Sequence, residues 1–301
     1  MIDAALFQSL RPHLFSVAYR MLGSASEAED IIQDAWLRTS AAPDDLESAR
    51  AWLTTVVTRL SLDQLKSARV RREEYVGPWL PEPVPTGAVE TAEDVVARRE
   101  SVTMAFLVLL ERLTPQERAA FLLREVFDSD YSQIARVLDS TEAAARQLVH
   151  RAKVRVGEGR PRFEASPVEQ RELATRFFSA VRDGDLSRLE ELLASDVVFQ
   201  ADGGGKVSAA RRPIVGADAV ARALVGIWQK ANQMLGGGWG GYVSSINGEA
   251  ALLAMVHGRL NGVFVVSTHE GRISAIRVVR NPDKLAWLAE HAEDASRETA
   301  R

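Results

Sequence analysis

One stretch, Thr114–Arg155, restricts the fold of this chain more than any other. Its first residue can cap a helix, Pro115 suits the first helical position, and Glu117 can close a capping box. A short predicted helix, Tyr131–Leu138, is followed by a three-residue connection and a longer basic helix from Glu142. This order predicts a helix-turn-helix. An ordinary helical hairpin would explain the same residues, because helix pairs are common.

Composition limits the class of protein. With 301 residues, two or three domains are expected. The net charge of −4 means that any nucleic-acid binding must come from local basic patches. There is no cysteine, which excludes disulfides, cysteine zinc sites and thiol chemistry. No apolar run approaches the roughly 20 residues that span a bilayer, and no signal peptide is visible. We therefore expect a cytoplasmic protein with no membrane contact, no metal and no cofactor.

Residues 1–75 predict only helices. The segment Glu27–Arg38 has an apolar side and an acidic side. Taken alone, the acidic side could be merely solvated or could bind a partner. The side expected to be apolar holds Ile31, Ile32, Ala35 and Trp36, and the other holds Glu29, Asp30, Gln33, Asp34 and Arg38.

A second amphipathic segment, Ala51–Glu73, becomes strongly basic in its second half. Basic side chains with Trp52 and Tyr75 nearby suit a nucleic-acid backbone and unstacked bases. A solvated amphipathic helix would have the same pattern. The basic residues are Arg59, Lys66, Arg69, Arg71 and Arg72, opposed within that span by Asp63.

Residues 76–97 predict an extended linker, because four prolines stand within eight residues. The span contains acidic residues but no Lys or Arg. Trp79 and Leu80 are apolar, so we expect the linker to dock on another part of the protein. A helix from about Ala92 to Leu113 should then lead into the helix-turn-helix.

The second half predicts a separate α+β domain, in which helices precede an antiparallel meander whose curved sheet can wrap around a cavity. The dipeptides Asn247-Gly248 and Asn261-Gly262 predict hairpin turns, and Glu270-Gly271 predicts a further turn. The expected helices are Val168–Asp183, Leu186–Ala194, Ala217–Ala231 and a last one after Asn281, and the expected first strand is Val197–Ala201.

Polar residues of this second half suggest chemistry only weakly. The loop Asp202–Lys206 lacks the spacing of a Walker loop and the Ser or Thr that ends one. His257 and Arg259 are expected to share a strand face, with Asp202 across the cavity, a set that could bind a small polar ligand or move protons. A satisfied histidine and a surface arginine are the more common outcome, so we expect no enzymatic activity.

The order of these parts resembles the extracytoplasmic-function family of bacterial RNA polymerase sigma factors. The resemblance covers about residues 5–157, and its most specific segments are Ala28–Arg38, Ala51–Glu73, Leu113–Phe127 and Tyr131–Lys153. It implies two all-α sigma domains. Residues 1–75 would bind core polymerase and the promoter's minus-ten element, residues 76–97 would form the linker, and the helix-turn-helix of residues 98–157 would read the minus-35 element.

The family's motifs also imply roles for single residues. Many members carry Asn where Arg59 stands and Gly where Asp139 stands, although Asp tolerates left-handed backbone geometry better than most residues. The implied polymerase-binding residues are Asp30, Gln33, Asp34 and Trp36, and those beside the minus-ten element are Arg59, Asp63, Lys66, Arg69 and Arg72.

The second helix of the motif can be interpreted physically. Glu142, Arg146 and His150 are four residues apart and share one face, with Gln147 beside them. Arg can bind guanine, Gln adenine and Glu cytosine in a major groove. The basic residues further along are better placed for phosphates, which position the protein without specifying sequence. They are Arg151, Lys153 and Arg155.

The predicted regulatory domain, residues 168–290, resembles over about residues 168–285 the cone-shaped SnoaL-like group of the nuclear-transport-factor-two fold. A sigma-J-like subset of these sigma factors carries such a domain, with WLPEP-like, DGGGK-like and NPDKL-like segments, which stand here at Trp79–Pro83, Asp202–Lys206 and Asn281–Leu285. The resemblance implies regulation in cis through linker and loop, so replacing Trp79 or Lys206 should change transcription. The implied contact residues are Trp79, Leu80, Pro81, Glu82 and Pro83 with Asp202, Gly203, Gly204, Gly205 and Lys206.

The implied partners are core RNA polymerase, through its β′ clamp and β flap, and promoter DNA. A small-molecule ligand in the carboxyl-terminal domain stays open. The main alternative is a stand-alone, ligand-responsive helix-turn-helix regulator, which would have no use for the first 75 residues. A small-molecule isomerase or cyclase with a DNA-binding appendage is a further alternative.

Overall fold

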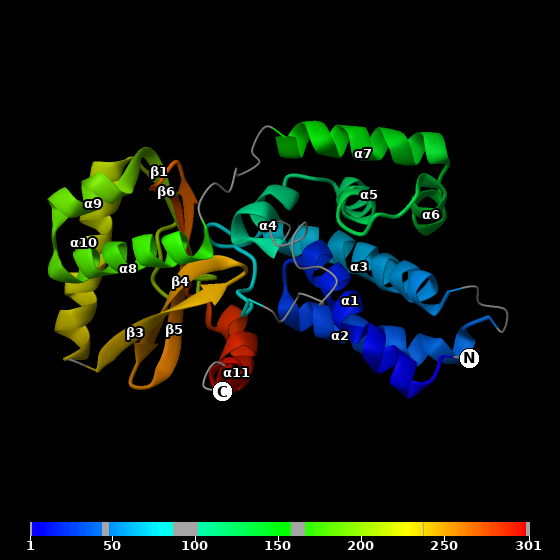
Figure 1. The fold of residues 1–301 in the computed structure, drawn as a ribbon, viewed down its shortest axis with the longest axis horizontal. Helices are drawn as coiled ribbons and strands as arrows, with labels where there is room; N and C mark the ends of the chain where they lie inside the picture. Colours follow the sequence, from blue (N-terminus) through cyan, green and yellow to red (C-terminus); the bar gives the residue numbers. More distant parts are fainter. Residues whose placement is uncertain (1, 44–47, 87–101, 158–165, 237, 299–301) are drawn as a thin grey trace. The chain divides into compact units, whose positions relative to one another are not determined.

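The computed structural model describes residues 2–43, 48–86, 102–157, 166–236 and 238–298 (Figure 1). The chain divides into two compact units. The described part of the first unit comprises residues 2–43, 48–74, 102 and 106–157, and the second contains Tyr75–Thr86, Thr103–Ala105 and the described residues after 161. Within these ranges, no helix has the length and apolar character needed to cross a membrane.

The first unit is helical, as the sequence predicts. Asp3 caps the first helix by accepting a hydrogen bond from the backbone N–H of Leu6, and the helix ends at Gly23, whose φ is +67°. Ser24 caps the second helix. The helices are α1 (Ala4–Leu22), α2 (Ala25–Leu37), α3 (Ala49–Glu73), α4 (Met104–Leu110), α5 (Pro115–Glu125), α6 (Tyr131–Val137) and α7 (Glu142–Gly157).

The helix-turn-helix is present at α6 and α7, preceded by the capped helix α5. Thr114 and Glu117 form the predicted capping box, and Asp130 with Gln133 forms a second one at α6. Asp139 in the connection adopts left-handed geometry, with φ at +49°. The joint is apolar and contains Ala120, Leu123, Ile134, Ala135, Val137, Ala145 and Val149. Small alanines allow these helices to approach closely.

The predicted helix Ala92–Leu113 is only partly within the described residues. Residues 92–101 lie outside them, and α4 ends at Leu110, three residues before the predicted end.

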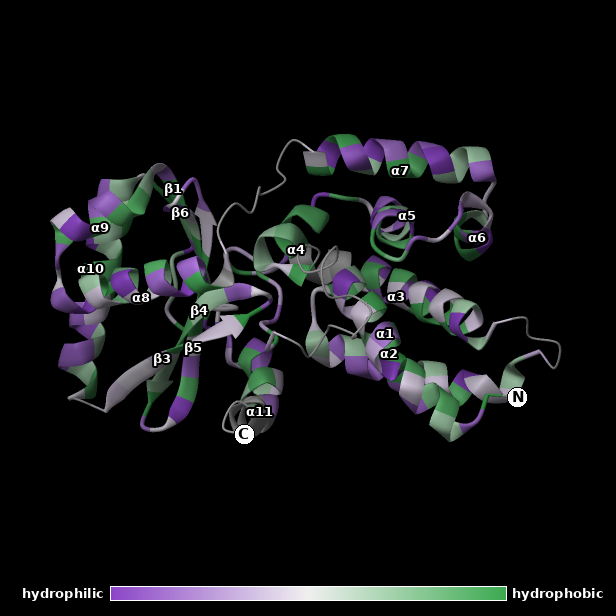
Figure 2. Ribbon diagram, in the orientation of Figure 1, coloured by the Kyte–Doolittle hydropathy of each residue, from purple (hydrophilic) through white to green (hydrophobic). Residues whose placement is uncertain are grey.

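The second unit is an α+β domain built on a six-stranded sheet in the order β2-β1-β6-β5-β4-β3. Strand β1 pairs with β6 in parallel, and the other pairs are antiparallel. The helices Pro167–Asp183, Leu186–Leu192 and Ala217–Leu235 pack apolar residues against the sheet, and apolar residues are green in Figure 2. The elements are α8 (Pro167–Asp183), α9 (Leu186–Leu192), β1 (Leu193–Asp202), β2 (Ile214–Val215), α10 (Ala217–Leu235), β3 (Trp239–Ile246), β4 (Glu249–Val256), β5 (Arg259–His269), β6 (Arg272–Val279) and α11 (Pro282–Glu298).

Two predicted turns of the meander are confirmed and one is wrong. Asn247 and Glu270 have φ of +54° and +50° and open tight turns, each followed by a glycine. The β4–β5 turn, however, lies at His257-Gly258, and Asn261 instead occupies a register shift within β5. The predicted helix Leu186–Ala194 also ends early, because Leu193 already begins β1.

We expect Asp139→Val to lower the free energy of unfolding by about 1–2 kcal/mol, because a β-branched side chain tolerates left-handed geometry poorly. Asp139→Gly should stay within about 0.5 kcal/mol of the native value, since relief of strain is offset by a more flexible unfolded chain. Urea denaturation measures both. Ser140→Val, at the neighbouring exposed position, is the control, and an equal loss there would contradict the argument.

Candidate functional site

Helix α2 presents a polar face that the first unit leaves exposed. Asp30, Gln33 and Asp34 are all exposed, and the predicted apolar side chains Ile31, Ile32 and Ala35 are buried. Trp36 departs from the prediction of an apolar, inward side chain, because 38% of its surface is exposed. Its ring packs edge-on against Phe7 with centroids 4.9 Å apart. The face therefore combines carboxylates with an aromatic ring that is held in place and still accessible.

The first arginine in the basic half of α3, Arg59, is exposed but is hydrogen-bonded to another helix. The guanidinium of Arg59 donates hydrogen bonds to the carbonyl oxygens of Arg136 and Val137, at 2.6 and 3.1 Å. These carbonyls end α6, where a helix carries partial negative charge. Lys66 forms an exposed ion pair with Asp63 at 2.8 Å. The side chains of Arg69 and Arg72 lie outside the described residues.

Helix α7 places the whole predicted base-reading set on its exposed surface. Arg146 pairs with Glu142 at 3.0 Å and lies over the ring of Tyr131, 4.8 Å from its centroid. Gln147 and His150 are exposed, and no side-chain partner for either occurs among the described residues. This face can supply both donors and acceptors to a base edge.

The basic residues predicted to contact phosphate instead hold α7 on α5. Glu117 of α5 forms ion pairs with Arg151, at 3.2 Å, and with Arg155. Lys153 pairs with Glu125 at 2.9 Å. About half of each basic side chain remains exposed, so these residues could still contact a phosphate from the outer side.

Glu117 is almost fully buried, with 3% of its side chain exposed. Burial alone would raise the pKa of this carboxyl. Hydrogen bonds from Thr114 and the charges of Arg155 and Arg151 act in the opposite direction and prevail, so the pKa of Glu117 lies below its ordinary value. Glu117 therefore stays ionised at neutral pH and joins the capping box to α7.

In the second unit, the linker contacts the predicted loop through one fully buried carboxylate. Asp202 accepts hydrogen bonds from the Tyr75 hydroxyl at 2.6 Å, from the Leu80 backbone N–H at 2.8 Å and from Lys284 Nζ at 2.7 Å. The backbone N–H of Gly204 donates at 3.0 Å. Burial first, and then the nearby Asp202, raises the pKa of Tyr75, so its hydroxyl remains a donor.

The linker beyond Leu80 is also buried on this domain. Leu80 and Val84 are each only 1% exposed, and Pro81, Glu82 and Pro83 are buried too. Val84 exchanges hydrogen bonds with Asn247, donating to its Oδ1 at 3.1 Å and accepting from its N–H at 2.9 Å. The linker thus continues the sheet edge at the β3–β4 turn, which is a form of strand addition.

Two glycines of the Asp202–Lys206 loop stand where a larger side chain would clash with its neighbours. A Cβ on Gly203 would lie 2.5 Å from the carbonyl oxygen of Val207. Gly204 is left-handed, and a Cβ there would lie 2.3 Å from the amide nitrogen of Asn281. That amide donates to the Tyr75 hydroxyl at 2.9 Å. The glycines therefore let the loop approach the residues that hold the linker.

The structure assigns the linker contact to a different lysine from the predicted one. Lys206 is exposed and pairs with Asp283, whereas Lys284 is buried. Lys284 Nζ donates to the carbonyl of Leu80 at 2.5 Å and lies 4.1 Å from the centroid of the Trp79 ring, a cation–π contact. The sequence signal was present in the segment Asn281–Leu285, but sequence reasoning gave no role to its lysine.

A second buried carboxylate holds the chain where the helix-turn-helix segment begins. Glu249 accepts hydrogen bonds from the backbone N–H of Met104 at 2.7 Å and from the Ser267 hydroxyl at 2.6 Å. Burial raises the pKa of Glu249, and the charge of Arg277 opposes that effect. Sequence reasoning missed this contact, because a single glutamate at a strand start carries no motif.

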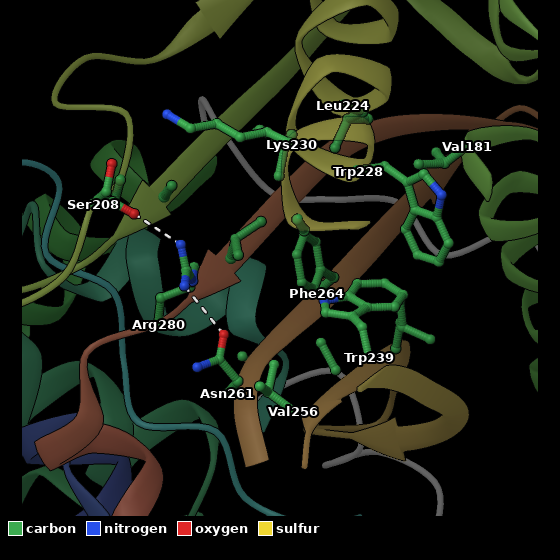
Figure 3. A pocket seen from close by; sticks show the side chains of 18 of the residues that line it. Val181, Ser208, Leu224, Trp228, Lys230, Trp239, Val256, Asn261, Phe264 and Arg280 are labelled. Atoms are coloured by element: carbon green, nitrogen blue, oxygen red, sulfur yellow. Dashed lines mark hydrogen bonds between the residues drawn. The ribbon is translucent and has the colours of Figure 1, made fainter. Parts of the chain in front are cut away.

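The suggested set of Asp202, His257 and Arg259 is not assembled. Asp202 is occupied by the linker, and His257 lies in the β4–β5 turn. None of the three lines the apolar cavity of this domain (Figure 3). The described lining contains neither a carboxylate nor an imidazole that could act as a general base.

Glu117→Gln should lower the free energy of unfolding at pH 7 by about 1–3 kcal/mol. This is less than the cost of breaking a wholly buried ion pair, because both arginine partners of Glu117 are half exposed. A depressed carboxyl pKa stabilises above the unfolded value and loses that effect as pH falls through the folded value. Wild type and variant should therefore converge as the pH falls through the lowered pKa of Glu117. Denaturation at several pH values measures this.

Glu125→Gln is the matched control. It removes the carboxylate that pairs with Lys153, and Glu125 is more exposed than Glu117. Its loss should stay below about 0.5 kcal/mol. A constant difference between wild type and Glu117→Gln from pH 7 to pH 3 would contradict the proposed ionisation.

Comparison with known proteins agrees with this geometry. Residues 6–71 match the family described as Sigma-70 region 2, and residues 103–156 match Sigma-70, region 4. The chain is 39% identical to "ECF RNA polymerase sigma factor SigJ" of Mycobacterium tuberculosis, over 94% of this chain and 93% of that protein. It is 34% identical to "Probable ECF RNA polymerase sigma factor SigI" of the same species, over 94% of each.

The crystal structure of the M. tuberculosis extracytoplasmic-function sigma factor SigJ aligns with a TM-score of 0.74 at 37% identity, covering 94% of this chain and 98% of that chain. The similarity thus includes the carboxyl-terminal domain. The chain belongs to the extracytoplasmic-function family of RNA polymerase sigma factors, with two helical sigma domains followed by an α+β domain.

Proposed function

We propose that this protein binds core RNA polymerase, directs it to a specific class of promoters in the cytoplasm, and is regulated in cis by its SnoaL-like domain. The observation that carries the proposal is the family relationship along nearly the whole chain. We assign core and minus-ten binding to residues 1–75, the linker to 76–97, minus-35 binding to 98–157 and regulation to 168–290.

The exposed faces of α2 and α7 support the first part. Asp30, Asp34 and Trp36 offer charge around an accessible aromatic ring, a composition suited to a protein partner. On α7, Gln147 and His150 are free to meet base edges, and Arg146 needs only to leave its exposed partner Glu142. An exposed i, i+4 ion pair is worth only about 0.3–0.5 kcal/mol, so DNA can displace it.

The minus-ten face needs a larger change. Arg59 Nε and Nη2 donate to the carbonyls of Val137 and Arg136, so presenting the whole guanidinium to DNA requires these two hydrogen bonds to break. Hydrogen bonds from a charged donor contribute about 1.5–3 kcal/mol each. We therefore infer that the free protein binds promoter DNA poorly and that polymerase binding separates α3 from the end of α6.

Regulation in cis follows from competition for the linker. Tyr75, Leu80 and Val84 are bound to the SnoaL-like domain by hydrogen bonds, and residues 80–84 are buried there. The acidic linker could instead pass through a basic channel of the polymerase. One segment cannot occupy both positions, so docking on the domain opposes assembly with polymerase.

We infer that the SnoaL-like domain acts by binding and not by catalysis. Proton transfer needs a base within hydrogen-bond reach of a substrate. The carboxylate that sequence reasoning suggested, Asp202, is saturated by linker and loop donors.

Transcription with purified core polymerase tests the main proposal. A genome-wide run-off with this protein should yield transcripts from a discrete promoter set. Asp34→Arg should lower output at least tenfold, because it reverses charge on the polymerase-binding face. Arg146→Ala should relax discrimination at one upstream base, at a cost of about 1–3 kcal/mol.

Glu190→Arg is the control for Asp34→Arg. It makes the same change of charge at an exposed residue of α9, and it should leave transcription unaltered. Tight duplex binding without polymerase, together with no promoter-specific transcript, would favour the stand-alone regulator and refute the sigma-factor proposal.

Lys284→Met tests regulation. It removes the cation that bridges Asp202 to the Leu80 carbonyl, so linker docking should weaken by about 3 kcal/mol. We expect faster hydrogen exchange at the Leu80 amide and several-fold higher transcription. Lys206→Met removes an exposed lysine that pairs with Asp283, and it is the control for charge. Faster Leu80 exchange without any change in transcription would contradict regulation through the linker.

A further inference from the structure

The SnoaL-like domain contains a cavity of about 440 Å³ between α8, α10 and the sheet (Figure 3). This volume lies in the range of small-molecule sites, roughly 300–1,000 Å³. Its walls are almost wholly apolar and rich in rings from α8, α10 and three strands. The rings are Phe177, Phe178, Phe199, Trp228, Trp239 and Phe264.

Two of these rings form an ordered wall. Trp228 of α10 and Trp239 of β3 meet edge to face, with centroids 3.9 Å apart. Such a pair presents one aromatic face and one aromatic edge to a neighbouring group. A flat apolar body can pack against this wall with little loss of side-chain freedom, because packing already restricts both indoles.

The polar end of the cavity is cationic. Arg280 donates to the carbonyl of Ser208 at 2.9 Å and to Asn261 Oδ1 at 3.1 Å, as the dashed lines in Figure 3 show. Both acceptors are neutral, and no carboxylate among the described residues pairs with this guanidinium. Burial lowers the pKa of Arg280, as expected for a cation without an anionic partner. Lys230 lines the same cavity, and no acidic residue does.

We propose that this cavity binds a small amphipathic anion, with its apolar, preferably aromatic body against Trp228 and Trp239 and its carboxylate or sulfonate on Arg280. The guanidinium has five donors, and its two neutral acceptors leave capacity for an oxyanion. An anion would provide the missing countercharge, and charge-assisted hydrogen bonds are the strongest of their kind.

The site is also connected to the linker, and this step rests on the proposed regulatory role of the linker. The backbone N–H of Arg280 donates to the carbonyl of Asp202 at 2.7 Å. The side chain of Arg280 holds Ser208, which follows the glycine loop that begins at Asp202. An anion that draws Arg280 away from Ser208 therefore shifts the loop whose first carboxylate holds Leu80.

Binding can be tested on the full chain with a matched pair of fluorescent probes. The anionic probe is 8-anilinonaphthalene-1-sulfonate, and the neutral probe is N-phenyl-1-naphthylamine, which has the same rings without the sulfonate. Energy transfer from tryptophan reports occupancy of the cavity. We expect one anionic probe per chain, bound at least tenfold more tightly than the neutral one.

Variants locate the site. Arg280→Gln should weaken the anionic probe roughly ten- to a hundredfold and change the neutral probe less than about twofold. Ala231→Trp, which fills the cavity from α10, should abolish both. Arg259→Gln removes a cation outside the lining and is the control. Equal affinity for both probes, or an anionic probe indifferent to Arg280→Gln and Ala231→Trp, would overturn the proposal, as would no binding at all.

Hydrogen exchange tests the connection to the linker. Saturating anionic probe should change the exchange rate of the Leu80 amide at least threefold in wild type and leave it unaltered in Arg280→Gln. An occupied cavity with unchanged Leu80 exchange would overturn the connection. Failure of the proposed function would be separate, because polymerase-dependent transcription would be absent whatever the probe does.

Discussion

The buried carboxylate of Asp202 is the interaction on which the second unit and the linker jointly depend. A charge taken out of water costs several kcal/mol unless it is paired and hydrogen-bonded. Asp202 has four donors, of which the Leu80 N–H comes from the linker and the Tyr75 hydroxyl from the residue directly before it. The other two, Gly204 N–H and Lys284 Nζ, belong to the domain and would remain if the linker left. Linker docking is therefore favourable without being irreversible.

The helix-turn-helix also depends on one buried carboxylate, that of Glu117. Glu117 completes the cap of α5 and at the same time fixes α7 through Arg151 and Arg155. One carboxylate thus sets both where α5 begins and where α7 lies. The cost is that two of the basic residues suited to phosphate are already engaged. Of the predicted base-reading residues, Gln147 and His150 have no side-chain partner among the described residues, whereas Arg146 is paired with Glu142.

Much of the fold and part of the candidate site could be predicted from local sequence rules. The cap at Thr114 and the turn at Asn247-Gly248 depend on neighbours within a few residues, so sequence identifies them. The β4–β5 turn was misplaced because His257-Gly258 and Asn261-Gly262 are both compatible with a tight turn. Strand pairing decides between them, and it places a bulge at Asn261.

By itself, the sequence determined the order of helical domains, linker and α+β domain, and the exposed reading face of α7, because helical periodicity and caps are local. Only the tertiary structure decided that Arg59 faces the end of α6, and that Lys284 rather than Lys206 holds the linker. It also decided that Arg280 lies at the end of an apolar cavity, where no acidic residue among those described pairs with it. Each of these depends on which distant groups share a buried space, and a buried charge selects its partners through the cost of leaving water.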